Sequence, residues 1–300
     1  MFEVTLLAKP YALDLQQRFW PGVTVHPFVA PWTAFKHKYR LWNWRWSEFY
    51  HLHKRFKGKL DVGVSARWDP RDHFLLALTG ARRRLGFPRM GSQLFLTETV
   101  QSPSATAHRY EYWRALGSKL GLELPEIHLA FPPTCNKGSE VLIHSGASQA
   151  VRVWPLPRYH ALAKSLREKG FQVRIACDAN QRDWWMTSGE TAVSTPRSLA
   201  ELLSCIDQAA AFIGNDSGPG HLAALMGVPT FTFFGPQIPE LFVPMHSAAE
   251  FISGSPCRYM PCSDYCRFPS ALCLEGISEA HAVLRVEQFL RKNIQTPLQA

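Results

Sequence analysis

The 300-residue sequence lacks any uninterrupted apolar run that approaches the roughly 18 residues of a membrane-spanning helix. Its start, Met1–Phe2–Glu3–Val4, has neither the basic segment nor the cleavable apolar core of a secretory signal. A Gly-x-Gly-x-x-Gly turn after a predicted strand is also missing, which disfavours a dinucleotide-dependent oxidoreductase. With 46% apolar and 19% charged residues, the chain is predicted to be a folded protein of the cytoplasm.

The cysteines lack the pattern of a secreted disulfide framework and the paired Cys-x2-Cys knuckles of common zinc sites. There are seven in a long chain, an odd number that favours reduced thiols. Four of them, Cys257, Cys262, Cys266 and Cys273, follow the spacing C-x4-C-x3-C-x6-C. They are interpreted as packed or surface thiols, with a structural metal site as the alternative.

Acidic residues are scarce in one part of the chain. The net charge is +9 overall, and the segment from Thr33 to Met90 alone carries +10. Such a local excess predicts an acidic partner, which would be anionic lipid, a phosphorylated saccharide or nucleic acid, or else a solvated basic face. No recognition helix, zinc finger or RNP motif accompanies it, so no nucleic acid is expected as a partner.

Tryptophans are concentrated in this basic segment. Trp42, Trp44 and Trp46 stand among Lys36, Lys38, Arg40 and Arg45. Aromatic rings among cations suit a membrane interface, a single-stranded nucleic acid or a loop that grips a glycolipid head group. The alternative is that the tryptophans pack under a surface loop. The hypothesis is peripheral contact with an anionic membrane surface.

The second half of the chain alternates predicted strands and helices. Strands are expected at 141–144, 171–177, 209–213 and 230–234, and helices at 157–169, after a capping box at Ser198 and Glu201, and at 278–294. This alternation predicts a parallel sheet covered by helices on both faces. The first half is a less regular α/β segment, with strands at 3–8, 23–29 and 60–65 and helices at 48–56 and 72–78. The turn-rich segment 132–138 is the predicted domain boundary.

One segment predicts a phosphate site. Asn215–Asp216–Ser217–Gly218–Pro219–Gly220–His221 follows an apolar strand and leads into a short helix that Gly227 and Pro229 end. Asp216 and Ser217 are suitable N-cap residues, and the two glycines allow a ligand to approach the backbone. The free N–H groups and dipole of the helix start favour an anion, although a capped turn without a ligand is the alternative.

These residues also resemble a known family. Asn215–Asp216–Ser217–Gly218–Pro219 with His221–Leu222–Ala223–Ala224, then Gly227–Val228–Pro229–Thr230 and Phe234–Gly235–Pro236, resemble the signature of glycosyltransferase family 9, the bacterial lipopolysaccharide heptosyltransferases. Residues 60–62, 80–87, 145–155 and 257–283 resemble further family segments in the same order. The resemblance covers most of the chain from Glu3 to Leu290.

The resemblance implies an α/β protein of two Rossmann-like domains in the GT-B architecture. Residues 1–135 would form the acceptor-side domain, 139–277 the donor-binding domain and 278–294 a C-terminal helix. Family members transfer heptose from ADP-heptose to a saccharide acceptor with inversion, and they need no metal ion or other cofactor. The implied donor-binding residues here are Ser148, Arg152, Asp178, Asp216, Ser217, Gly218, Pro219 and His221. Arg152 stands where the family commonly has Lys, and Asp178 is a candidate for the nucleoside ribose.

The chain departs from the family pattern at its start. Family members begin with a strand and a glycine-rich turn that holds an Asp, the proposed general base, whereas Met1–Ala8 matches the family's second strand. Asp14 does not match that base, so the catalytic residue is unknown and the first domain is expected to be incomplete. The expected function is heptosyl transfer to a lipopolysaccharide-core or related glycolipid acceptor by a cytoplasmic protein, peripheral to the inner membrane. A truncated or non-catalytic nucleotide-sugar-binding protein is the alternative.

Overall fold

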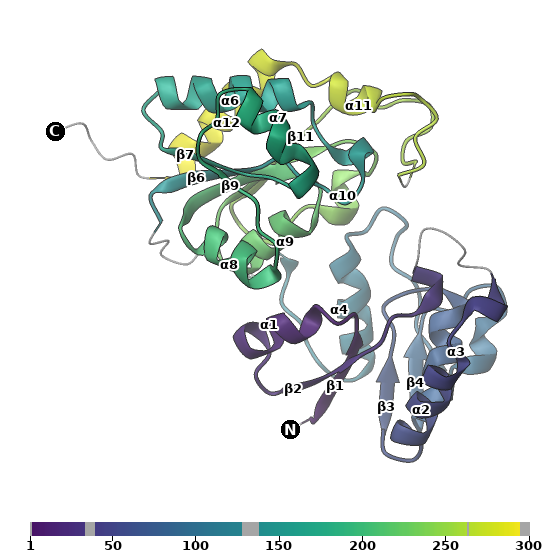
Figure 1. Cartoon of the computed structure of the whole chain (residues 1–300). Coiled ribbons are helices and arrows are strands. Elements are labelled where there is room, and N and C mark those ends of the chain that lie inside the picture. The colour runs from purple at the N-terminus through teal and green to yellow at the C-terminus, as the bar shows by residue number, and fades with distance from the viewer. Residues whose placement is uncertain (1, 34–39, 128–137, 263, 295–300) are drawn as a thin grey trace. The chain divides into compact units, whose positions relative to one another are not determined.

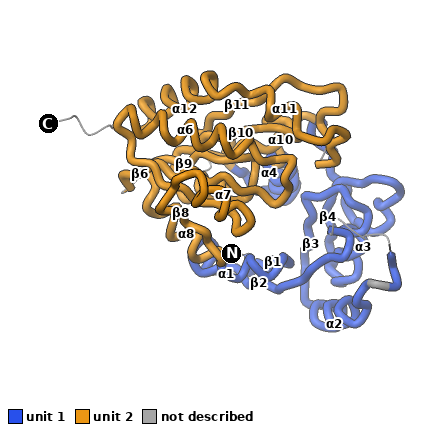
Figure 2. Tube along the Cα trace, turned by 45° about the horizontal axis from the view of Figure 1, so that its top comes forward, with its two compact units in different colours: residues 1–105, 110–124 blue, residues 106–109, 125–300 orange. Residues whose placement is uncertain are grey.

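The computed structural model describes residues 2–33, 40–127, 138–262 and 264–294. These residues form two compact units (Figures 1 and 2). Unit 1 comprises residues 1–105 and 110–124, and unit 2 comprises 106–109 and 125–300. The predicted domain boundary lies almost entirely in residues 128–137, outside the described part of the chain, as do Lys36 and Lys38.

Unit 2 is built on a six-stranded parallel sheet, as the alternating pattern predicts. The strand order is β11-β10-β9-β6-β7-β8. The strands are β6 (Glu140–His144), β7 (Val173–Ala176), β8 (Val193–Ser194), β9 (Ala209–Asn215), β10 (Thr230–Phe234) and β11 (Ala249–Ser253). All residues of β9 and β10 are buried because helices cover both faces of the sheet.

Two sets of helices cover the two faces (Figure 1). One core is formed with α6 (Leu156–Glu168), α7 (Arg182–Thr187) and α12 (Glu279–Asn293), against which Ala211 and Ile213 of β9 pack. The other is formed with α8 (Leu199–Asp207) and α9 (Gly218–Leu225), against which Phe212 packs. Alternate side chains of β9 thus point to opposite faces, because the side-chain period of a strand is two.

Local sequence signals set several helix ends in unit 2. Ser198 caps α8 by accepting a hydrogen bond from the N–H of Glu201 at 3.2 Å. The expected reciprocal bond of the capping box is shifted by one residue, since the Glu201 carboxylate accepts from the N–H of Arg197. Gly227 follows α9 with φ +76°, a conformation that glycine adopts without steric cost.

The C-terminal part of unit 2 contains a long loop. After α10 (Pro239–Phe242) and β11, residues 254–271 lead to α11 (Leu272–Glu275) and then to α12. A side chain at Gly254 would overlap the carbonyl oxygen of Cys273, so the two ends of the loop are packed backbone to backbone. The loop is therefore closed at its base.

Unit 1 contains two smaller parallel sheets. Strands β1 (Val4–Ala8) and β2 (Val23–Pro27) form one, and β3 (Val62–Val64), β4 (Arg83–Gly86) and β5 (Glu98–Thr99) form the other. The helices are α1 (Ala12–Phe19), α2 (Trp46–Phe56), α3 (Pro70–Thr79) and α4 (Arg109–Lys119), with 3-10 turns η1 (Pro31–Thr33), η2 (Leu41–Asn43) and η3 (Ser92–Phe95). In unit 2, the turns η4 (Ala150–Arg152) and η5 (Ala179–Gln181) follow β6 and β7.

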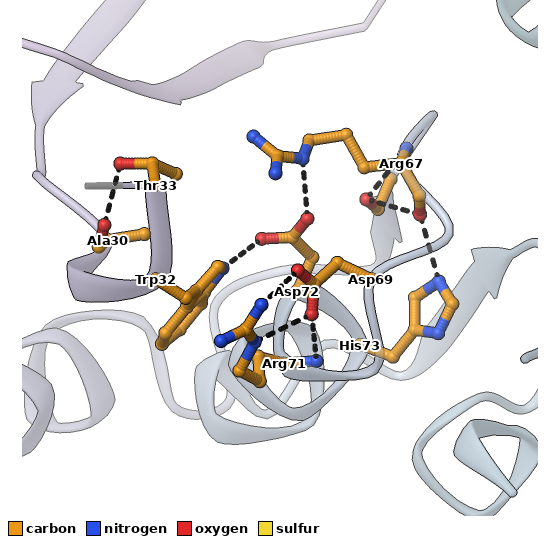
Figure 3. A network of polar contacts seen from close by, with 9 residues as sticks. Ala30, Trp32, Thr33, Arg67, Asp69, Arg71, Asp72 and His73 are labelled. Atoms are coloured by element: carbon orange, nitrogen blue, oxygen red, sulfur yellow. Dashed lines mark hydrogen bonds and ion pairs between the residues drawn. The ribbon is translucent and has the colours of Figure 1, made fainter. Parts of the chain in front are cut away.

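A polar network fixes the start of α3 (Figure 3). Asp69 is its N-cap and accepts hydrogen bonds from the backbone N–H and the guanidinium of Arg71. Asp72 accepts a hydrogen bond from Trp32 Nε1 at 2.8 Å and pairs with Arg67. Burial raises the pKa of Asp72, which the Trp32 hydrogen bond and Arg67 oppose. The network ties the 3-10 turn at Trp32 to the helix.

Candidate functional site

Three loops meet at the carboxyl edge of the unit 2 sheet. These loops follow β9, β6 and β7, which lie side by side in this order in the parallel sheet. The carboxyl ends of the three strands therefore lie at one edge. The loop after β6 carries Ser148 and Arg152, Asp178 follows β7, and Asp216 follows β9. The sequence-predicted donor residues therefore lie on loops at this edge.

Arg152 and Asp216 are in direct contact. Arg152 Nη1 donates to the carbonyl oxygen of Asp216 at 3.2 Å and to its Oδ2 at 3.3 Å. The Asp216 side chain is 4% exposed and that of Arg152 is 22% exposed. An ion pair this poorly hydrated holds its geometry better than one on an open surface. The structure thus brings together two residues 64 positions apart that the sequence assigns to one site.

Burial changes the protonation of Asp216. The pKa of Asp216 is raised to about 6: desolvation is the largest cause, Arg152 opposes it, and the nearby carboxylate of Asp264 adds a smaller upward contribution. The position of Asp216 in the sequence suggests that its carboxyl caps α9. In the structure it does not, because the carboxyl is turned to Arg152. Its charge is instead part of a buried cluster with Arg152.

The start of α9 lies directly beside this pair. Ser217 occupies the N-cap position, but its hydroxyl donates to the carbonyl oxygen of Asn215 at 3.2 Å instead of capping the helix. Gly218 and Pro219 form the first turn, and no atom of the described residues lies within 4 Å of a Cβ built on Gly218. The helix start is therefore sterically open. Pro219 has no N–H, and the N–H of Gly220 donates to the carbonyl oxygen of Ser217 at 3.2 Å, so the N–H of Gly218 is the donor of this turn that has no partner within the helix.

His221 lies in the first turn of α9. Desolvation is the largest cause that lowers the pKa of His221 to about 4, and the nearby His108 and Arg152 also lower it; part of the residue remains exposed to solvent. We expect a neutral imidazole at pH 7. His108 belongs to unit 2, and its Nε2–H donates to the carbonyl oxygen of Val243 at 2.9 Å.

Ser148 and Asp178 are placed differently from the Arg152–Asp216 pair. Ser148 is exposed on the loop after β6, and Asp178 is partly buried at the start of η5. A side chain at Gly146 would overlap the Asp178 carboxylate, so this glycine allows the two loops to pack closely. Neighbouring His144 is buried, and among the described residues its Nδ1 has no hydrogen-bond partner. Burial lowers the pKa of His144, while the charge of Asp178 raises it.

Two residues of this region carry contacts that the sequence analysis missed. Asp264, in the loop 254–271, accepts from Arg152 Nε at 2.6 Å and Nη2 at 2.7 Å. Asn215 is 1% exposed and connects the ends of β6 and β9 through four hydrogen bonds. A polar residue at the end of an apolar strand was the available signal for Asn215. No local pattern pointed to Asp264.

The cysteine segment gives no metal site in the described residues. The thiols of Cys257, Cys262, Cys266 and Cys273 are reduced. Within the described ranges, no group of three or more His, Cys, Asp or Glu side chains is placed to hold a metal ion. Burial raises the pKa of both Cys262 and Cys273, so these thiols are neutral at pH 7.

Unit 2 has a parallel sheet with helices on both faces, and an arginine lies beside an open helix start at the carboxyl edge of this sheet. This arrangement is typical of α/β proteins that bind phosphate-containing ligands. The model of the family Glycosyltransferase family 9 (heptosyltransferase) matches residues 74–270. The chain belongs to this family.

Curated relatives match parts of the chain. Lipopolysaccharide heptosyltransferase 1 of Pseudomonas aeruginosa is 32% identical over 127 residues, which are 41% of this chain and 35% of the relative. Lipopolysaccharide heptosyltransferase 3 of Escherichia coli is 28% identical over 160 residues, 50% of this chain and 46% of the relative. The matched segments thus span between a third and a half of the relatives' length.

Solved structures show the same fold across nearly the whole chain. The family 9 glycosyltransferase of Veillonella parvula has a TM-score of 0.74 at 18% identity and covers 97% of this chain and 89% of that one. E. coli heptosyltransferase WaaC with ADP-2-deoxy-2-fluoro heptose has a TM-score of 0.68 at 16% identity, over 96% and 89%. The α/β fold with parallel sheets, expected from the sequence, is that of the GT-B heptosyltransferases.

Proposed function

We propose that this protein is an inverting glycosyltransferase that transfers heptose, or a related sugar, from a nucleotide sugar to a lipopolysaccharide-core or related saccharide acceptor. ADP-heptose is the proposed donor. The observation that carries the proposal is the Arg152–Asp216 pair beside the open start of α9. It lies within the segment that matches the family, and a structural neighbour contains an ADP-heptose analogue.

The chemistry needs positive charge at the leaving group. When the sugar is displaced, negative charge grows on the departing diphosphate. Arg152 and the dipole of α9 would stabilise this charge in a partly desolvated site, without a metal ion. Neutral His221 would contribute a hydrogen bond, and Asp178 at the end of β7 would contact the nucleoside ribose. Ser148, Ser217, Gly218 and Pro219 complete the proposed donor-binding set.

Calorimetry and a transfer assay test the proposal. We expect the protein to bind ADP-heptose more tightly than UDP- or GDP-sugars, and to release ADP in the presence of a lipopolysaccharide-core acceptor. Preference for a UDP-sugar would contradict the donor assignment. Binding of ADP-heptose without release of ADP would support the alternative, a non-catalytic nucleotide-sugar-binding protein, because the general base of the reaction is not assigned to any residue.

A second part of the proposal concerns unit 1, which would hold the acceptor and contact an anionic membrane from the cytoplasmic side. In the described ranges, no helix combines the length and apolarity needed to cross a bilayer. The surface around α2 exposes Trp42, Trp46 and Tyr50 by 78%, 50% and 62%. Trp44 is buried instead, at 9% exposure, and packs against Trp32 and Phe49.

Cations lie on the same helix, α2. Lys54 and Arg55 line a cavity of about 400 Å³ together with His26, His51 and one acidic residue, Glu48. Exposed aromatic rings beside cations suit an anionic interface, where rings enter the head-group region and cations meet phosphates.

Vesicle sedimentation tests this surface. We expect binding to vesicles that contain anionic phospholipid at low salt and loss of binding at high salt. The variant Trp42→Ala should bind several-fold more weakly, since this side chain is 78% exposed. Trp46 is less suitable for replacement because it donates a hydrogen bond to the carbonyl oxygen of Leu41 and packs against Trp44 and Phe49. Equal binding to purely zwitterionic vesicles would contradict an electrostatic contact. Trp113→Ala, in α4, is the control, because that exposed tryptophan lies outside the basic segment.

A further inference from the structure

The guanidinium of Arg152 has two carboxylate partners of unequal strength. Asp264 takes the Nε–Nη2 edge in a bidentate pair at 2.6 and 2.7 Å. Asp216 receives only Nη1, at 3.2 and 3.3 Å. Short bidentate bonds fix the plane of a guanidinium, whereas one long contact allows it to rotate. The orientation of Arg152 in the site is thus set mainly by Asp264.

Asp264 is itself held firmly. Its side chain is 7% exposed, and its backbone has φ +72°, a left-handed conformation that Asp tolerates better than most residues. The loop is closed at its base by the contact of Gly254 with Cys273, and the N–H of Cys262 donates to the carbonyl oxygen of Pro236 at 3.2 Å. The carboxylate therefore belongs to an anchored loop and not to a freely moving surface side chain.

We propose that Asp264 is a positioning residue, which orients Arg152 toward the diphosphate of the donor. This inference rests on the proposed function of the Arg152 site. An unrestrained arginine side chain loses rotamer entropy when a ligand fixes it, which weakens binding. The bidentate pair with Asp264 imposes that order before the ligand arrives. Asp264 occupies the Nε–Nη2 edge of the guanidinium, and Nη1 is directed to Asp216, the residue before the N-cap of α9.

The pairing favours arginine over lysine at position 152. An ammonium group has no planar edge with which to hold Asp264 in a bidentate pair and reach Asp216 as well. We therefore expect Asp264 to raise the affinity for ADP when position 152 is arginine and to change this affinity little when position 152 is lysine. This expected dependence makes the proposal testable by a double-mutant cycle.

Calorimetric titration with ADP tests the inference on four proteins: wild type, Asp264→Asn, Arg152→Lys and the double variant. Asp264→Asn should weaken ADP binding about tenfold, the size expected for a hydrogen bond to a charged group. In the Arg152→Lys background the same change should alter the affinity less than about twofold. Asp264→Glu should restore part of the affinity, since it keeps the carboxylate. Unfolding temperatures will show whether each variant is folded.

A matched control is available in Arg167 and Glu190. They form a bidentate pair at 2.6 and 3.0 Å in the same unit, so Glu190→Gln makes the same chemical change outside the site. It should lower stability without weakening ADP binding. Unchanged or tighter ADP binding by folded Asp264→Asn would overturn the positioning role, and tighter binding would identify Asp264 as a competitor of the ligand.

A failure of the proposed function would be seen in the wild-type protein and not in the variants. Wild-type protein that binds no ADP would refute the donor site. In that case the Nε–H signal of Arg152 in ligand-free protein, measured by NMR, still tests the orientation. We expect slow hydrogen exchange at this group in wild type and fast exchange in Asp264→Asn. Equal exchange in both proteins would overturn the inference regardless of ligand binding.

Discussion

The side-chain oxygen of Asn215 accepts a hydrogen bond from the backbone N–H of Trp154 at 2.9 Å, which fixes the loop after β6 to the end of β9. The same oxygen accepts from Tyr159 Oη at 2.9 Å, and the amide nitrogen donates to the carbonyl oxygens of Ser145 and Gly146. All hydrogen-bonding groups of this buried side chain are thus satisfied. The position of Arg152, two residues before Trp154, depends on this connection.

Replacement of Asn215 with alanine is expected to destabilise the protein by about 3 kcal/mol or more. The change leaves several buried donors and acceptors without partners, and each such group costs about 1–3 kcal/mol. Chemical denaturation measures this loss. Tyr159→Phe removes one of the four bonds and should cost only about 1 kcal/mol. Equal stabilities of the two variants would show that Asn215 does not connect the loops.

Replacement of Arg152 with alanine should weaken ADP-heptose binding by about 10- to 100-fold, the range expected for a lost hydrogen bond to a charged group. It also leaves Asp216 and Asp264 buried without their cation, so a lower unfolding temperature is expected. Arg167→Ala is the control, because it also removes a bidentate arginine–carboxylate pair. A similar loss of affinity in both variants would argue against a specific role for Arg152.

The stability contributed by Asp216 is expected to depend on pH. Its pKa in the folded protein is about 6, above its ordinary value of 3.8, so the folded state binds this proton more tightly. The contribution is therefore full below pH 3.8 and is lost as the pH rises to about 6, with an upper bound of about 3 kcal/mol. Denaturation of wild type and Asp216→Asn from pH 4 to 7 measures it. A stability difference that does not change over this range would contradict a raised pKa.

Replacement of Gly146 with alanine is expected to displace Asp178 and to weaken ADP-heptose binding. The added methyl group would overlap the Asp178 carboxylate, and overpacking of this kind typically costs about 1–3 kcal/mol. Titration with ADP-heptose and with heptose-free ADP will show whether the nucleoside part is affected. Gly22→Ala is the control, because open space surrounds that position. Unchanged nucleotide affinity would remove Asp178 from the proposed ribose contact.

Several elements of unit 2 could be predicted from short stretches of sequence. The strand at Thr230–Phe234 was predicted with its observed bounds, because an apolar run between Pro229 and Gly235 has clear limits. Gly227 ends α9 as expected. The strand expected at 171–177 is shorter, Val173–Ala176, whereas α9 begins at Gly218, directly after the predicted N-cap residue Ser217. Propensity places an element well but defines its ends poorly, since caps and tertiary contacts decide them.

The candidate site was predicted only in part. Arg152 and Asp216 were assigned to it by resemblance, and their contact confirms that they lie together. Asp264 was not assigned to the site, because it lies 112 residues from Arg152 and the segment 257–283 was interpreted through its cysteines and its resemblance to the family, not through this carboxylate. Trp44 was grouped with Trp42 and Trp46, yet it is buried while the other two are exposed. Residue type and spacing do not show which side chain an irregular loop turns inward.

The sequence alone determined the alternation of helices with the strands β6, β7, β9 and β10 in unit 2, the glycine and proline that limit α9, and the family. These depend on local backbone preferences and on the spacing of apolar side chains, which neighbouring residues specify. Only the tertiary structure decided which charges meet at the carboxyl edge of the sheet. The pairing of Arg152 with Asp264, and the burial that raises the pKa of Asp216, require segments far apart in sequence to exclude water together.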